Sequence, residues 1–446
     1  MKFRELRPYQ QEVFEWAVPK SHIALFLKMR LGKTILAIRW FEARRLKRVL
    51  IVCPLAVVQT WLDELAAEGI EAVTLHSRFG ADLIDAMADL PELVAVTHYE
   101  AIRSRDWGAW QWDCVILDES TRIRKPDIKL TRQVLKTFQN VPNKAVLSGC
   151  PAPETIIDYF NQMKFLYGTF MGVESYNLFK ENFMYRNLSG KLLPCPHVKS
   201  AVEQYIADNA YVLDYKDVGF ADRKTLIKRY CELSDEHREI YDDVESSFEF
   251  EGNETQWQIV VSNWLCQLAG GFPKNRAFVS DHKIKELKEL FAGELYGEQS
   301  IILCKHSNEI RACKELLGKH AEVIRGGTPI PQRDEIVKSF QKKQTQHIVA
   351  QVRCLQYGLN LSVANTIIFY SNSWEFEHRF QALQRIVDLE KHEPSLVIDL
   401  ITKNTIDEDI YDSLDTKGKN YSDFMHNVFR RFCERVGKKR AELSNT

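Results

Sequence analysis

The sequence of 446 residues has almost no net charge, because 60 Lys and Arg residues balance 61 Asp and Glu residues. A total of −1 does not by itself indicate a nucleic-acid-binding protein, although a basic groove can be hidden within a neutral total. No apolar run approaches the ~18 residues that a transmembrane helix needs, and the N-terminal residues lack the apolar stretch of a signal peptide. We therefore expect a cytoplasmic protein without membrane association, and a nuclear location stays open.

The chain also lacks the cysteine patterns of a metal site. Its ten cysteines include no CxxC pair, and several of them, such as Cys53, Cys114 and Cys304, lie in apolar runs. This placement is typical of reduced thiols that pack as small hydrophobic side chains. Cys195 and His197 form a close Cys/His pair, but without partners at metal-ligand spacing, so no zinc is expected.

Strand-like runs alternate with helical patterns in two parts of the chain, before residue 155 and after residue 281. This alternation predicts an α/β fold with two parallel sheets that carry helices on both faces. The expected strands are Ile23–Leu27, Val49–Cys53, Val94–Thr97, Val115–Leu117 and Ala145–Leu147 in the first part, and Ser300–Cys304, Glu322–Ile324, His347–Gln351, Thr366–Phe369 and Leu396–Ile401 in the second.

The remaining segments read differently. Residues 156–280 are rich in aromatic residues at helical spacing, which favours a helical insertion with a packed core, and Tyr230–Leu233 is a short strand candidate. The tail is basic from Arg430 to Arg440, and it is either a solvated helix face or a contact for phosphates. We expect four segments: 1–155, 156–280, 281–415 and 416–446.

A glycine-containing loop follows the first apolar run. Lys28-Met-Arg-Leu-Gly-Lys-Thr34 lies between the strand ending at Leu27 and a helical pattern, which is the context of a phosphate-binding loop. Backbone N–H groups at the start of that helix would bind an anion. Lys33 would reach the outer phosphates and the Thr34 hydroxyl would hold Mg²⁺, although the first glycine of the usual loop is replaced by Leu27.

A second acidic element supports a nucleotide site. Asp118 and Glu119 end a short apolar strand. In phosphoryl-transfer enzymes an aspartate at this place holds Mg²⁺ and the adjacent glutamate polarises the attacking water. Ligands of parallel sheets bind at the carboxyl ends of strands, where both the loop and these carboxylates fall.

Taken in order, the motifs of this chain resemble those of the superfamily 2 helicase-like ATPases, and within them the Swi/Snf-type double-stranded DNA translocases. The resemblance covers roughly residues 5–415. The motifs that carry it are Leu6–Gln10, Lys28–Thr34, Ile51–Leu55 with Trp61, Thr97–Glu100, Asp118–Pro126, Leu147–Pro151, Gly358–Ser362 with Trp374, and Gln381–Arg385.

The resemblance implies two RecA-like lobes with ATP and Mg²⁺ between them and DNA, double-stranded or branched, as the partner. It implies catalytic roles for Lys33, Asp118, Glu119 and Arg385, with Arg385 stabilising charge on the transferring phosphoryl group. The positions that it implies for nucleotide binding are Gln10, which would read the adenine, and Arg30, Leu31, Gly32, Lys33, Thr34, Gly358 and Gln381; Thr34 and Asp118 would hold the metal. Most members of the family track along duplex DNA, and the resemblance leads us to expect that this chain does so in replication, recombination or repair.

Three departures from the family pattern bear on activity. Thr121 replaces a frequent histidine, and Cys150 stands where motif III carries a threonine. More seriously, motif VI carries two arginines three positions apart in the family, and here the second is Asp388. Either Arg385 serves alone, or a cation such as Arg379 or Lys391 substitutes, or hydrolysis is crippled, since an arginine finger is worth about three to five decades of rate.

Three functions therefore remain open. The first is a DNA-dependent ATPase that translocates on duplex or branched DNA. The second is a strand-separating helicase on DNA or RNA, although no wedge element is recognisable. The third is a nucleotide-gated DNA-binding protein with weak or no hydrolysis, motivated by Asp388 and Thr121. A metabolic kinase is disfavoured because it would not need the second sheet domain.

Overall fold

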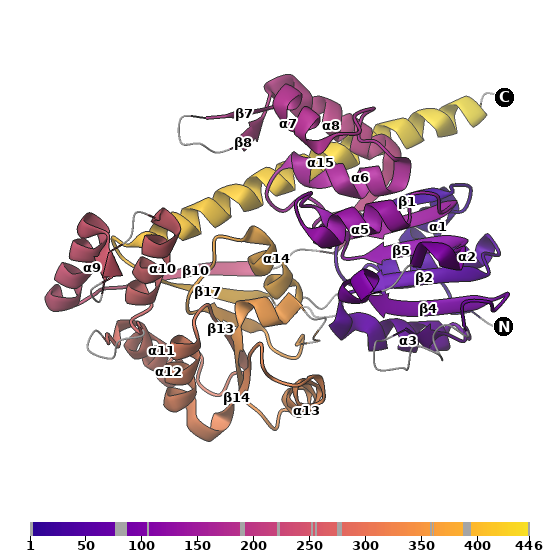
Figure 1. Ribbon diagram of the computed structural model, residues 1–446. Helices are drawn as coiled ribbons and strands as arrows, with labels where there is room; N and C mark the ends of the chain where they lie inside the picture. The colour runs from indigo at the N-terminus through magenta and orange to yellow at the C-terminus, as the bar shows by residue number, and fades with distance from the viewer. Residues whose placement is uncertain are drawn as a thin grey trace. The chain divides into compact units, whose positions relative to one another are not determined.

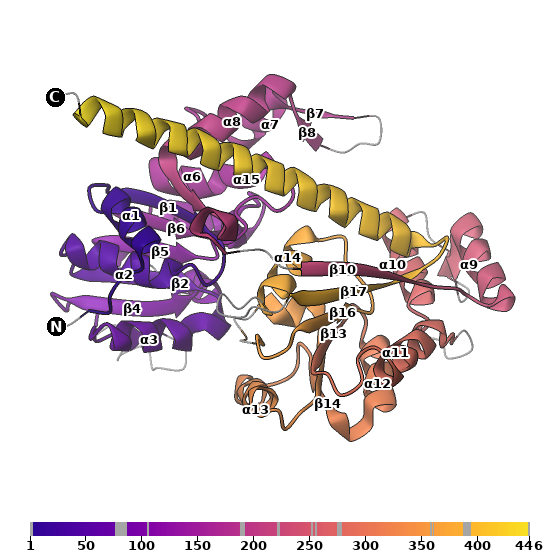
Figure 2. The ribbon, with the colours of Figure 1, turned by 180° about the vertical axis from the view of Figure 1, so that it is seen from behind.

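The computed structural model describes residues 3–444, with the exception of 76–86, 105–106, 188–191, 221–223, 251–252, 255–256, 274–278, 357–358, 360 and 387–393. The chain folds into two compact units (Figures 1 and 2). Unit 1 combines Met1–Ala221 with Lys419–Thr446, and unit 2 is Asp222–Gly418. Among the described helices none is long and apolar enough to cross a membrane.

Unit 1 is built on a seven-stranded sheet with the order β3-β4-β2-β5-β6-β1-β9. Every pairing in this sheet is parallel. Its strands are β1 His22–Leu27, β2 Arg48–Cys53, β3 Val73–Thr74, β4 Leu93–His98, β5 Cys114–Asp118, β6 Asn143–Leu147 and β9 Ala210–Leu213. The central strands are apolar at nearly every position, as expected of a sheet that is covered on both faces.

Helices and short 3₁₀ turns connect these strands. The helices of unit 1 are α1 Pro8–Ala17, α2 Lys33–Ala43, α3 Val58–Ala67, α5 Lys129–Thr137, α6 Tyr159–Tyr167, α7 Tyr176–Phe183 and α8 Pro196–Asn209. The 3₁₀ turns are η1 Leu55–Val57, η2 Tyr99–Ser104, η3 Trp107–Trp110, η4 Ser120–Ile123, η5 Ile156–Asp158 and η6 Tyr215–Val218, and a hairpin pairs β7 Met184–Arg186 with β8 Leu192–Pro194. α6 packs on β1 and β6, and α3 packs on β4.

Unit 2 is built on a six-stranded parallel sheet with the order β10-β17-β16-β13-β15-β14. Its elements are β10 Lys224–Cys231, α9 Asp235–Ser247, β11 Glu249–Phe250, β12 Asn253–Glu254, α10 Gln258–Ala269, α11 His282–Ala292, β13 Ser300–Cys304, α12 Ser307–Leu317, η8 Gly318–His320, β14 Ala321–Ile324, α13 Ile330–Gln341, β15 His347–Gln351, η9 Val352–Gln356, β16 Thr366–Phe369, α14 Phe376–Gln384 and β17 Ser395–Thr402.

The central strand β13 shows that both faces of this sheet are buried. Ile301 and Leu303 belong to one hydrophobic core, and Ile302 and Cys304 belong to a second. Because successive side chains of a strand point to opposite faces, the two cores lie on the two sides of the sheet.

The last helix, α15 Ile406–Ser444, contains 39 residues and contributes to both units. Its first part, through Gly418, belongs to unit 2, and the part from Lys419 onward belongs to unit 1 (yellow in Figures 1 and 2).

The predicted α/β fold with two parallel sheets is confirmed, and each strand expected from the apolar runs is present within one or two residues. The 156–280 segment is more than a helical insertion, because it adds β9 to the sheet of unit 1 and β10 to the sheet of unit 2. β10 begins six residues before the expected Tyr230–Leu233 strand. The four-segment domain division stays a prediction.

Candidate nucleotide-binding site

The predicted phosphate loop connects β1 to α2. It turns through two left-handed residues, Arg30 with φ 64° and Gly32 with φ 89°, and α2 begins at the next residue, Lys33. The positive φ of residue 32 favours glycine, and a Cβ atom there would overlap Nε2 of Gln10, so a side chain would displace the end of Gln10. Leu31 is fully buried beneath the turn.

Gln10 of α1 lies directly against this loop. Its Nε2 donates to the Leu31 carbonyl oxygen at 3.4 Å, and its Oε1 accepts from the Arg7 backbone N–H at 2.9 Å. The side chain is largely buried. The residue expected to read the base is therefore fixed next to the residues expected to bind the phosphates.

Lys33 and Thr34 open α2, the helix whose N-terminus favours an anion. The Lys33 ammonium donates to the Leu27 carbonyl oxygen at 2.9 Å and lies 3.5 Å from that of Lys28. Thr34 is half-buried in the first turn. Their roles in binding the outer phosphates and the metal stay predictions.

The loop is supported from β9 and η6, which sequence reasoning missed. The Tyr215 hydroxyl donates to the Met29 carbonyl oxygen at 3.1 Å, and the Lys28 backbone N–H donates to the Leu213 carbonyl oxygen at 3.1 Å. Tyr215 and Met29 are separated by 186 positions, and nothing in either local pattern links them.

Asp118 ends β5, and its side chain is held in place by two donors. Oδ2 accepts from Nε1 of Trp61 at 2.8 Å, and Oδ1 accepts from the Glu119 backbone N–H at 3.0 Å. Burial raises the pKa of the Asp118 carboxyl, although the Trp61 hydrogen bond and the nearby Lys33 charge oppose that rise. Glu119 follows in a left-handed conformation with φ 50°.

Trp61 and Tyr99 were expected as parts of family motifs, and the structure gives each a contact with Asp118. The fully buried Tyr99 donates its hydroxyl to the Asp118 carbonyl oxygen at 2.7 Å. With the indole of Trp61 on the carboxylate, these two aromatic residues fix the side chain and the backbone of Asp118.

The segment after β6 completes the group of strand ends. Ser148 accepts the Cys150 backbone N–H at 3.1 Å. A Cβ atom on Gly149 would lie 3.6 Å from Nζ of Lys33 and 3.5 Å from Cγ of Met29. The carboxyl ends of β1, β5 and β6, which are neighbours in the sheet, therefore bring the loop, Asp118 and Gly149 together.

The remaining predicted site residues belong to unit 2. Arg385, at the end of α14, is buried and donates from Nε to the Leu355 carbonyl oxygen at 2.7 Å. Gln381 is also buried, with Nε2 3.4 Å from Oε1 of Glu377. Gly358 and Asp388 lie outside the described residues.

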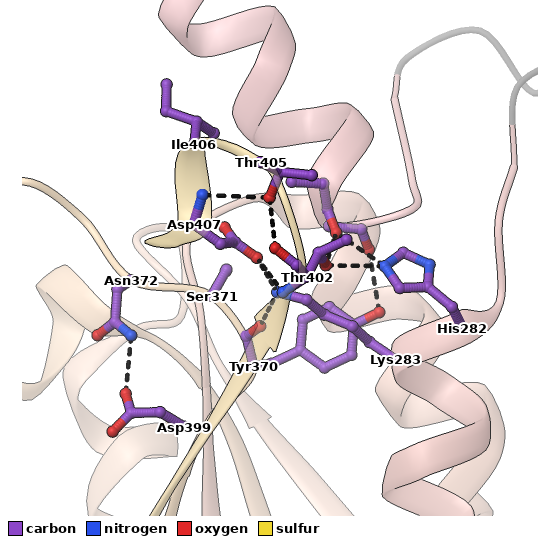
Figure 3. A network of polar contacts seen from close by, with 12 residues as sticks. His282, Lys283, Tyr370, Ser371, Asn372, Asp399, Thr402, Thr405, Ile406 and Asp407 are labelled. Carbon is purple, nitrogen blue, oxygen red and sulfur yellow. Dashed lines mark hydrogen bonds and ion pairs between the residues drawn. The ribbon is translucent and has the colours of Figure 1, made fainter. Parts of the chain in front are cut away.

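Arg379 does not fit the role of a substitute for the missing arginine. Its guanidinium binds both oxygens of Asp399, at 2.6 and 2.8 Å, and also donates to Asn372 at 3.0 Å. Asn372 in turn donates to Asp399 at 2.8 Å (Figure 3). Burial by itself would lower the pKa of Arg379, but the charge and the hydrogen bonds of Asp399, with smaller contributions from Tyr411 and Asp415, raise it on balance. Breaking a buried ion pair lowers the stability of a fold by about 3–5 kcal/mol. We therefore expect Arg379 to stay paired with Asp399 in the core of unit 2.

No group of three or more His, Cys, Asp or Glu side chains in the described part of the chain could form a metal cage. A Thr hydroxyl with one carboxylate leaves most positions of a bound ion to other oxygens, which suits Mg²⁺ because it usually keeps several waters and binds substrate phosphates. Thr34 and Asp118 are compatible with that mode of binding.

Two protein-family models match the chain. The SNF2-related domain matches residues 9–274, and the helicase conserved C-terminal domain matches residues 282–389. The chain is also similar to the human DNA excision repair protein ERCC-6, with 23% identity over 477 residues that cover 92% of this chain and 32% of that protein.

Two further relatives have comparable identity. The putative ATP-dependent helicase/translocase YwqA of Bacillus subtilis is 24% identical, with 92% of this chain and 48% of that protein covered. The DNA repair and recombination protein RDH54 of Saccharomyces cerevisiae is 21% identical, with 82% and 45% covered. The chain thus spans between a third and a half of the length of these relatives.

Among solved structures, the chain is similar to the Sulfolobus solfataricus SWI2/SNF2 ATPase core in complex with dsDNA. The TM-score is 0.45 and the identity is 21%, with 96% of this chain and 95% of that chain covered.

Proposed function

This chain belongs to the SNF2-related family, and from that membership we propose that it is an ATP-dependent motor that tracks along double-stranded or branched DNA. The observation that carries the proposal is the convergence of the Lys33 loop, Asp118 and Gly149 at neighbouring strand ends. A role in replication, recombination or repair accords with the names of the relatives, and the buried, free cysteines accord with a cytoplasmic location.

Different residues of unit 1 would bind different parts of the nucleotide. Gln10 would contact the adenine, while the backbone of Arg30, Leu31 and Gly32 would follow the phosphates. The end of the Gln10 side chain lies close against Gly32, so a side chain at position 32 would displace Gln10 from this place. Lys33 would place its charge on the outer phosphates, where it neutralises charge that grows during transfer.

The carboxylates act on the metal and on water. Asp118 and Thr34 would hold Mg²⁺, which when bound neutralises charge on the phosphate oxygens. Trp61 and Tyr99 keep Asp118 in one orientation, so its position need not be reorganised during the reaction. Glu119, next along the chain, would orient the attacking water and accept its proton, and Arg385 would supply the cation from the second lobe.

A second function is favoured by the contacts of Arg379. Because Arg379 is bound to Asp399, it cannot replace the arginine that is missing at Asp388. If neither Arg385 alone nor Lys391 supplies the missing charge, the protein would bind ATP and DNA without turnover, as a nucleotide-gated DNA-binding protein.

The test is ATP hydrolysis by the purified protein, alone and with duplex DNA, single-stranded DNA or RNA. We expect hydrolysis to rise with duplex DNA and to fall by about 100-fold or more in Lys33→Ala, since one group that stabilises transition-state charge is worth about that much. Lys47→Ala is the matched control, because Lys47 is an exposed lysine of the same unit, paired with Glu92.

The other outcomes separate the alternatives. ATP binding without turnover on any nucleic acid would refute the motor and support the gated binder, and recovery of turnover by Asp388→Arg would identify the defect. Release of a labelled strand from duplex DNA or RNA would instead show a strand-separating helicase.

A further inference from the structure

The C-terminal part of α15 packs into unit 1 through a buried stripe. Tyr421, Phe424, Met425 and Val428 are all buried, at the spacing of one helix face. The Tyr159 hydroxyl lies 3.4 Å from the Met425 sulfur, and the rings of Tyr159 and Phe424 are 5.6 Å apart. The first part of the predicted 416–446 tail thus forms part of the core of this unit, whereas Arg430, where the basic stretch begins, is exposed.

Polar contacts fix the same part of the helix to α8. Asn427 donates to Glu203 at 3.1 Å, and the Arg431 guanidinium bonds to Gln204 at 3.2 Å and to Ser200 at 2.9 Å. These contacts set the rotation of α15 about its axis, so the side chain of Tyr421 has a defined direction.

Tyr421 touches two of the strand ends that form the nucleotide site. Its hydroxyl donates to the Gly149 carbonyl oxygen at 3.1 Å, after β6. Its ring lies 5.0 Å from the ammonium of Lys28, after β1, and Lys28 is also 3.8 Å from Asp214. The cavity among these residues is about 10 Å³, which is the lower limit for one water molecule, so the ring fills the space.

Gly149 connects this contact to Lys33. Its carbonyl oxygen accepts from Tyr421, while the position of its missing Cβ faces Nζ of Lys33 at 3.6 Å. Rotation of the peptide after Gly149 would therefore change the space around the Lys33 ammonium. The Lys28 backbone is similarly close, since its carbonyl oxygen lies 3.5 Å from the same ammonium.

We propose that Tyr421 is a positioning residue for the nucleotide site, so that the docked C-terminal helix sets the geometry of the Lys33 loop and of Gly149. Tyr421 acts through Gly149 and Lys28 and does not itself touch the nucleotide. The inference rests on the proposed function, because it concerns regulation of the same site.

Two substitutions separate the hydroxyl from the ring. Tyr421→Phe keeps the ring near Lys28 and removes the hydroxyl, with its donation to Gly149 and its contact with Cys150 in the same 147–152 segment. We expect the KM for ATP to rise about three- to tenfold, as for the loss of one hydrogen bond that leaves its acceptor buried. Tyr421→Leu also removes the attraction between ring and ammonium, and its effect on KM should be larger.

The matched control is Tyr411→Phe, a buried tyrosine of the same helix whose ring contacts lie in unit 2. It should leave the KM unchanged. Hydrogen exchange of the backbone amides in 147–152 gives a readout that does not depend on turnover. Exchange there should be faster in Tyr421→Phe than in the wild type or in Tyr411→Phe.

The outcomes distinguish this inference from the proposed function. The positioning role would be overturned if Tyr421→Phe and Tyr411→Phe had equal KM values for ATP, equal affinities for a fluorescent ATP analogue and equal hydrogen exchange in 147–152. If the wild type binds the analogue but does not hydrolyse ATP, only the proposed motor function is refuted. The analogue affinities of Tyr421→Phe and Tyr411→Phe would then still decide the role of Tyr421. A wild type that binds no nucleotide would overturn both.

Discussion

At the scale of single residues, burial decides the charge of His282. Nε2 of its ring lies 2.9 Å from the Thr402 hydroxyl (Figure 3) and 3.0 Å from the Ala269 carbonyl oxygen. Nδ1 lies 2.9 Å from the Ser280 hydroxyl. A carbonyl oxygen only accepts, so Nε2 carries the proton and the neutral ring satisfies every partner. Burial, assisted by the neighbouring Lys283 charge, lowers the pKa of His282 to about 4.

This pKa predicts a loss of stability in acid. The folded state binds fewer protons than the unfolded state between the unfolded pKa of about 6.5 and the folded value. The free energy of unfolding should therefore be fully available above pH 6.5 and fall as the pH drops toward 4, by up to about 3 kcal/mol. Urea unfolding of the wild type and of His282→Gln at several pH values between 4 and 7 measures this.

The variant should show a shallower slope in that range, because glutamine keeps a donor and does not titrate. His197→Gln, at an exposed histidine of unit 1, is the control and should follow the wild type. Parallel curves for the wild type and His282→Gln would contradict the prediction.

At the scale of elements, one buried ion pair ties the start of α15 to the sheet of unit 2. The Lys283 ammonium, on α11, binds Asp407 at 2.6 Å and donates to the Tyr370 carbonyl oxygen at 2.9 Å (Figure 3). Asp407 also accepts from the Thr402 backbone N–H at 3.2 Å. Two opposite charges thus join the ends of β16 and β17 to the first turns of α11 and α15.

Removal of one charge should cost far more than removal of both. We expect Lys283→Met to lower the free energy of unfolding by about 3–5 kcal/mol, since Asp407 would stay buried without its partner. The double variant Lys283→Met with Asp407→Leu should recover much of that loss. Lys285→Met, on the same helix and in an exposed pair with Asp281, should change it by less than about 1 kcal/mol.

Chemical denaturation monitored by circular dichroism gives these differences. A single variant as stable as the wild type would show that the pair does not hold the elements together. A double variant less stable than Lys283→Met would show that polar contacts of Asp407 matter more than its charge.

Sequence predicted the elements that have a strong local pattern and missed those that depend on distant partners. β1, β5 and β13 are apolar runs followed by polar turns, so their positions could be read directly, and the nucleotide site expected at the ends of β1 and β5 stays a prediction. β9 has four residues within an aromatic segment of helical spacing, and only its pairing with β1 makes it a strand. Tyr421 and Gly149 are 272 positions apart, and no local pattern can report such a contact.

At the scale of the whole molecule, the fold of unit 1 depends on two separate pieces of chain. α15 carries one buried stripe in unit 2, with Ile406, Ile410 and Leu414, and a second in unit 1, from Tyr421 to Val428. The residues between the stripes, 415–420, are exposed or half-buried. The core of unit 1 in the folded protein therefore includes side chains from the last helix.

Truncation after Gly418 should destabilise unit 1 selectively. It removes four buried side chains, and each stabilises a fold by about 1.5–3 kcal/mol when fully buried. Their sum is comparable with the whole stability of a domain, about 5–15 kcal/mol, so the thermal transition of unit 1 should fall by tens of degrees or vanish. The transition of unit 2 should persist, because Ile406, Ile410 and Leu414 remain.

Differential scanning calorimetry resolves the two transitions, and hydrogen exchange of β1 and β13 assigns each one to its unit. Truncation after Arg431 is the control, since it keeps the stripe and the α8 contacts and should leave both transitions near those of the full chain. If the chain truncated after Gly418 keeps slow exchange in β1, the core of unit 1 closes without α15, and Tyr421 would then be an addition to a site that forms independently of it.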